Sequence, residues 1–169
     1  MKHLLLFIGL IVCAVAGAVT DEGIEKHEII PFIRFLEKEP LSKDAPLVRR
    51  ELLRWEERNS ADVDILVCPD LLAPLPDEKI QFNSELTCQY MFGIMSYQLT
   101  NPSARDHSIV YPAQLAGLHS LLRAYRAIVA QRPDAHIPEY DELIRQEEQS
   151  TLDENLRSEV ATKCKWPKT

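Results

Sequence analysis

Nineteen consecutive residues near the middle of the chain, 86–104, contain no charged side chain. Most of them are large and apolar, and Ser84 just before the run is a typical helix cap. A helix that is apolar on nearly every side must lie in a protein core or in a membrane. Two glutamines inside the run and an Asn-Pro stop at its end leave too short a span for a bilayer. We therefore expect a buried central helix.

A second long helix is expected soon after the first, because apolar residues recur every three or four positions over 111–132. The two helices would form a central pair over 84–132. Gly93 lies inside the first helix, where glycine costs ~1 kcal/mol relative to alanine. Its position therefore indicates that another backbone approaches closely there.

Shorter amphipathic helices are predicted on both sides of the pair, over 30–39, 45–58 and 137–165, the last range holding two acidic helices. Thr151 and Glu154 match a capping box at the start of the final helix. The segment 62–68 fits either a strand or a helix, and we favour a helix or an irregular packed segment. The prediction is an all-α single domain of five or six helices, packed as antiparallel hairpins around a central apolar helix.

The first 18 residues have the composition of a secretory signal peptide, with a basic start, an apolar run and Ala-Gly-Ala at the end. An uncleaved membrane anchor is one alternative, but it needs ~20 apolar residues, more than this run contains. A lipid on Cys13 is another, although the residue before it is not small. We predict cleavage near Ala18 and a secreted or periplasmic domain over 19–169, without stable membrane insertion of the mature chain.

The predicted mature chain is acidic, with 18 basic and 26 acidic side chains. This balance disfavours nucleic acid and anionic membranes as partners, because both require a basic surface. The charges are also segregated, since 107–133 contains three arginines and no acid, whereas 139–159 contains eight acids and two arginines. Either the acidic C-terminal helices cover the basic face, or the arginines are free to meet an anionic ligand or partner.

Three cysteines remain after removal of the leader, namely Cys68, Cys88 and Cys164. Export permits disulfides. We predict a Cys68–Cys88 bridge, whose loop of about twenty residues would contribute roughly 3 kcal/mol through the unfolded chain. The alternative is three unpaired thiols, with Cys88 buried as a small apolar residue. Cys164, near the chain end, would be free or intermolecular.

Motifs for enzymatic chemistry are scarce in this sequence. Its histidines, cysteines and carboxylates do not fall at the spacings of a metal site, so no metal or cofactor is predicted. One arrangement imitates a thiol-dependent hydrolase, with Cys88 as nucleophile and His107 as base. A cysteine inside so apolar a helix packs more often than it reacts. The hydrolase is therefore the alternative to a non-enzymatic protein.

Tyrosines and arginines gather on the central helix pair. A tyrosine combines an apolar ring with a polar tip, and an arginine binds a carboxylate through two parallel hydrogen bonds. Such side chains could line a pocket for a small acidic ligand, or the tyrosines could belong to the core. The candidate ligand-binding residues are Tyr90, Tyr97, His119, Arg123, Tyr125 and Arg126. The sequence favours an exported, non-enzymatic helical module that binds an unknown protein or a small acidic ligand.

Overall fold

The computed structural model describes residues 23–105 and 110–164. The predicted signal peptide and His107 lie outside these residues. Within them the chain forms six α-helices and no strand, packed into one helical domain, which confirms the predicted fold class. In the same residues a short 3-10 helix precedes the first α-helix, at Lys26–Glu28, and three more lie between later helices, at Pro69–Leu72, Pro102–Arg105 and Pro133–Ala135.

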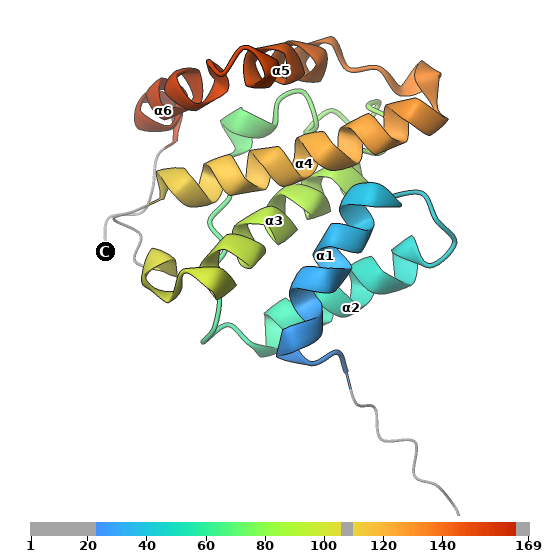
Figure 1. Ribbon diagram of the computed structural model, residues 1–169, viewed down its shortest axis with the longest axis vertical. Helices are drawn as coiled ribbons and strands as arrows, with labels where there is room; N and C mark the ends of the chain where they lie inside the picture. Colours follow the sequence, from blue (N-terminus) through green and yellow to red (C-terminus); the bar gives the residue numbers. More distant parts are fainter. Residues whose placement is uncertain (1–22, 106–109, 165–169) are drawn as a thin grey trace, which may run out of the picture.

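The six helices form three layers (Figure 1). The central layer is an antiparallel pair, α3 (Asn83–Thr100) and α4 (Tyr111–Gln131). The N-terminal layer on one side of this pair consists of α1 (Ile29–Lys38) and α2 (Ala45–Arg58). The C-terminal layer on the other side consists of α5 (Pro138–Glu148) and α6 (Leu152–Lys163).

The helix α3 is apolar on more than one side because it packs against both outer layers. Phe92 and Met95 pack into an apolar cluster with the N-terminal layer, whereas Tyr90 and Ile94 pack into a second cluster that reaches the C-terminal layer. Burying each such side chain stabilises the fold by about 1.5–3 kcal/mol. No helix in the described part of the chain is both long and apolar enough to cross a membrane.

Two glycines allow α3 and α4 to approach closely. A methyl group on Gly93 would lie 2.7 Å from the carbonyl oxygen of Ala116, and one on Gly117 would lie 2.9 Å from that of Tyr90. Neither position has room for a side chain unless the backbones move apart. The predicted close approach at Gly93 is thus confirmed.

Residues 63–68 adopt no regular secondary structure, in agreement with an irregular packed segment. Buried glutamines of the central helices provide its hydrogen-bond partners. Gln98 accepts a bond from the Asp64 amide at 2.8 Å and donates one to the Asp64 carbonyl at 2.7 Å, and Gln114 donates to the Leu66 carbonyl at 2.8 Å. The polar residues of the apolar helices therefore satisfy backbone groups that would otherwise be buried without partners.

The disulfide joins Cys68 to Cys164, with 5.4 Å between their Cα atoms, so the predicted Cys68–Cys88 bridge is wrong. Cys88 is a free thiol. The physical reason is that the two cysteines belong to opposite sides of α3. Cys68 lies in the cluster shared with α6, whereas Cys88 packs against the cluster of the N-terminal layer.

The start of α6 also differs from the prediction, because the expected capping box is absent. Thr151 has an α-helical backbone conformation and makes no capping hydrogen bond. Its hydroxyl donates instead to the carbonyl of Gln146 at 3.3 Å. A cap requires an extended backbone, which this tight α5–α6 connection does not provide.

Candidate functional site

Three of the six candidate ligand-binding side chains line one groove where α1, α3 and α4 meet. Tyr97 comes from α3, and His119 and Arg123 come from successive turns of α4. The groove has a volume of about 290 Å³, at the lower limit of small-molecule sites. We name it the Arg123 groove, and the residues that define it are Glu37, Gly93, Ser96, Tyr97, His119 and Arg123.

Helical spacing explains why these residues share a surface. On α3, positions 93, 96, 97 and 100 lie on one face, and on α4 the same holds for 116, 119 and 123. The helices touch at Gly93, and the small side chains at 96 and 116 leave the surface beside this contact open. The groove therefore lies beside the close contact of α3 and α4.

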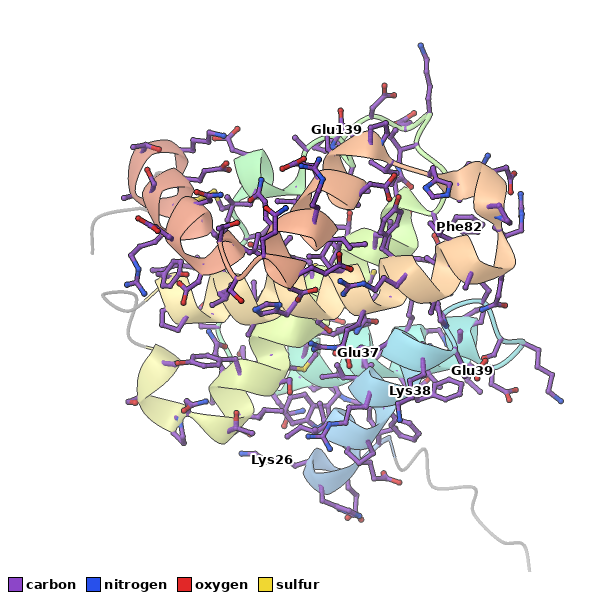
Figure 2. All side chains as sticks on the ribbon, turned by 45° about the horizontal axis from the view of Figure 1, so that its top comes forward. Lys26, Glu37, Lys38, Glu39, Phe82 and Glu139 are labelled. Carbon is purple, nitrogen blue, oxygen red and sulfur yellow. A yellow bond between two sulfur atoms is a disulfide. The ribbon has the colours of Figure 1, made fainter. Side chains whose placement is uncertain are left out.

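The electrostatic centre of the groove is an ion pair between Arg123 and Glu37. Arg123 donates two hydrogen bonds to the carboxylate, from Nε at 2.8 Å and from Nη2 at 2.7 Å. Ser120 donates a third to the same carboxylate at 2.6 Å, and its own hydroxyl accepts one from Gln89 at 2.8 Å. Figure 2 shows Glu37 on α1 beside α4. The buried side chains of Gln89 and Ser120 therefore help to fix the position of the Glu37 carboxylate.

This ion pair is oriented with its cation toward solvent. The Arg123 side chain is 50% exposed and the Glu37 side chain only 10%. A guanidinium carries five N–H donors, of which Glu37 uses two. Nearby, the Tyr97 hydroxyl makes no hydrogen bond to any residue that the structure describes. The groove therefore presents unused donors to an incoming group.

His119 and Arg126 share the carboxylate of Glu147 on α5. The Nδ1 atom of His119 contacts one oxygen, and Nη1 of Arg126 donates to the other at 2.6 Å. Partial burial raises the pKa of the Glu147 carboxyl, but these hydrogen bonds outweigh it and hold the pKa below its usual value. Of the two alternatives that the charge pattern left open, neutralisation by the acidic C-terminal helices holds for Arg126. It does not hold for Arg123, whose partner is in α1.

Tyr90 and Tyr125 are core residues and do not reach the groove. Tyr90 is fully buried and donates to Gln114, and burial raises its pKa. Tyr125 donates to Asp141 at 2.8 Å and accepts the Ile137 amide at 2.8 Å. Burial and the bond to Asp141 raise its pKa to about 12. Both hydroxyls are thus already satisfied inside the protein.

Sequence reasoning did not identify Glu37 as a member of the site. Glu37 follows Leu36 and lies four positions after Ile33, and both of these residues are fully buried. An acid at the edge of so apolar a stripe must lie near the core and needs a partner. The sequence therefore indicates that Glu37 needs a partner, but it does not indicate which residue that partner is.

The surroundings of Cys88 disfavour the thiolate form of its side chain. Burial raises the pKa of its thiol, an effect that Arg49 opposes and Glu85 reinforces. A raised pKa leaves little thiolate at neutral pH. The described residues also contain no cluster of three or more side chains able to hold a metal ion.

Comparison with models of protein families, with curated proteins and with solved structures found no match to this chain.

Proposed function

We propose that the protein is an exported, non-enzymatic binding module and that the Arg123 groove binds a small acidic ligand. The observation that carries this proposal is the outward guanidinium of Arg123, half exposed above a carboxylate that is nearly buried. An arginine fixed in this way is preorganised, since its own ion pair already restricts its rotamers. A carboxylate of the ligand would accept hydrogen bonds from the donors that Glu37 leaves unused.

Neighbouring side chains support a carboxylate-bearing ligand over an apolar one. Tyr97 supplies a hydroxyl that can donate a hydrogen bond to the carboxylate. Ser96 and Thr100 add small polar surface on the α3 wall. We therefore expect a compact, polar acid with few carbon atoms.

Export is supported by the signal-like sequence over 1–18 and by the Cys68–Cys164 bridge, because disulfides persist in oxidising compartments. Mass spectrometry of the non-reduced protein recovered after export would report the cleavage site and the bridge together. A product that retains residues 1–18 would contradict the proposed processing.

Calorimetric titration of the exported protein with succinate, and with succinamide as the neutral counterpart, tests the binding site. We expect saturable binding of succinate and much weaker binding of succinamide. Arg123→Gln should weaken succinate binding by at least about tenfold, because it removes a charge-assisted contact. Tyr97→Phe should weaken it by about threefold, since it removes a neutral hydrogen bond.

The matched control is Arg132→Gln, which removes the same charge from the end of α4. Arg132 is paired with Asp134 at 2.8 Å and does not line the groove. Binding should be unchanged in this variant. Absence of saturable succinate binding, or equal binding by wild type and Arg123→Gln, would remove the Arg123 groove as the site.

A further inference from the structure

A second, larger groove of about 430 Å³ lies between α2 and α3, on the N-terminal side of the molecule. Its apolar lining includes Leu53 of α2 and Cys88 of α3, both partly buried. Arginines of α2 stand around this apolar surface. We name it the α2–α3 groove, and its lining includes Arg49, Arg50, Leu53, Arg54, Glu57, Glu85 and Cys88. Its volume is within the range of small-molecule sites.

One of the three arginines is committed to the fold. Arg49 is only 14% exposed, donates to the Pro40 carbonyl at 3.0 Å and lies 3.8 Å from Glu85. It therefore neutralises the carboxylate that α3 contributes to the groove. The aliphatic part of its side chain adds to the apolar surface.

The other two arginines share a single acceptor. Arg50 and Arg54 both donate to the same oxygen of Glu51, at 3.4 Å and 3.1 Å. Their side chains are 58% and 53% exposed, whereas that of Glu51 is 22% exposed. Two cations with one inward carboxylate leave a positive charge and several N–H donors facing the groove.

A second acidic residue makes the rim asymmetric. Glu57 also lines the groove, about one helical turn beyond Leu53 along α2. It would repel an anion, so the cationic part of the rim is the part around Arg50 and Arg54. An occupant with one charged end and one apolar end fits this arrangement.

We propose that the α2–α3 groove binds a small organic acid with an apolar body. Its carboxylate pairs with Arg50 and Arg54, and its apolar part contacts Leu53 and Cys88. Burial of that part supplies most of the affinity, and the guanidiniums supply the preference for an anion. This site is separate from the Arg123 groove and does not depend on it.

Calorimetric titration of the whole exported protein with 1-naphthoate, and with the neutral 1-naphthamide, tests the proposal. Wild type should bind one naphthoate in this groove and prefer it to the amide by about tenfold or more. Arg50→Gln with Arg54→Gln should abolish that preference. Glu57→Gln should strengthen naphthoate binding about twofold to threefold, because it removes a like charge from the rim.

Matched variants locate the probe. Arg34→Gln with Arg58→Gln removes two charges from α1 and α2 outside the groove and should leave binding unchanged. Arg123→Gln should likewise have no effect, and an effect there would place the probe in the other groove and overturn the proposal. Succinate binding at the Arg123 groove should survive in the Arg50 and Arg54 variant. The two proposed sites are therefore tested independently of each other.

The free thiol provides a second readout, since Cys88 lies in the groove wall. Saturating 1-naphthoate should slow its alkylation by iodoacetamide at least about threefold, by covering the sulfur. Unchanged alkylation, equal affinity for acid and amide, or full naphthoate binding by the Arg50 and Arg54 variant would each show that no such site exists.

Discussion

The two outer layers are held to the central helix pair in different ways. The N-terminal layer buries broad apolar surface, to which α1 contributes Ile29, Ile33 and Leu36 and α2 contributes Leu52 and Trp55. The C-terminal layer buries one large side chain from α5 and a single stripe from α6. It is also the layer that carries the disulfide. The N-terminal layer, with its wide apolar face, packs against the central pair without a covalent link. The C-terminal layer has a narrower apolar face and more charge, and the disulfide reinforces its attachment.

Polar contacts join both outer layers to the central pair. In the C-terminal layer, Tyr140 donates from its hydroxyl to the Leu72 carbonyl at 3.0 Å and packs edge-on against Tyr125, with ring centres 5.5 Å apart. The basic face of α4 is shared between the layers, because Arg123 pairs with Glu37 of α1 and Arg126 with Glu147 of α5. Neither layer neutralises α4 alone.

The largest expected effect comes from removing the disulfide. Cys68 and Cys164 are separated by 96 positions, so their bridge restricts a long loop of the unfolded chain. Replacing both by serine should lower the free energy of unfolding by about 4 kcal/mol. Urea denaturation measures the loss, and hydrogen exchange should show α6 deprotected well before α1 and α2.

The control is Cys88→Ser, which removes a thiol that forms no bridge. It should cost about 1 kcal/mol or less, because the side chain is only partly buried. Equal loss of exchange protection in both outer layers of the bridge-free variant would contradict the conclusion that the C-terminal layer depends on the disulfide more than the N-terminal layer does.

The course of α6 was predictable from sequence, but the partner of its cysteine was not. Leu152, Leu156, Val160 and Cys164 follow at four-residue steps, and the first three are buried. The same stripe points Cys164 toward the core, which already argues against a free terminal thiol. Loop length instead favoured Cys88, since a short loop closes easily. Three-dimensional position, not loop length, decided the pairing.

Charge segregation likewise indicated that the basic face has partners without identifying them. An acid anywhere in the chain can neutralise Arg123, and Glu37 lies 86 positions away. Helix packing brings the two together, and periodicity alone does not specify which helices are neighbours. Three of the six candidate residues, Tyr97, His119 and Arg123, share one groove face. Tyr90 and Tyr125 are on the apolar stripes that form the core, which is the alternative that the sequence left open for the tyrosines.

A smaller effect is expected at the contact between α3 and α4, on which both layers depend. Gly93→Ala would place a methyl group 2.6 Å from Ser120 Cβ and 2.7 Å from the Ala116 carbonyl. The strain exceeds the gain in helix propensity, so we expect a net loss of about 2 kcal/mol by urea denaturation. Gly23→Ala is the control, because its methyl group meets only the flexible end of Arg58 and should cost less than about 0.5 kcal/mol.

The two ion pairs allow a direct comparison of the layers. Glu37→Gln affects three hydrogen bonds to a nearly buried carboxylate and should cost about 2 kcal/mol. Glu147→Gln affects a more exposed carboxylate, and we expect a loss below about 1 kcal/mol. Chemical denaturation of both variants gives the ranking, and the reverse order would show that α4 is held mainly by the C-terminal layer.

The smallest effect concerns pH. Burial raises the pKa of the Glu147 carboxyl, but hydrogen bonds from Arg126 and His119 prevail and hold it below the ordinary 4.5. The native state therefore binds fewer protons at this group than the unfolded chain. The stabilisation is complete above the unfolded value and is lost as pH falls through the lower, folded pKa. The difference in unfolding free energy between wild type and Glu147→Gln should thus shrink from about pH 6 to about pH 3. A difference that stays constant over this range would mean that the Glu147 contacts do not depend on its charge, and that the C-terminal layer is held by the disulfide, the apolar stripe and its neutral contacts.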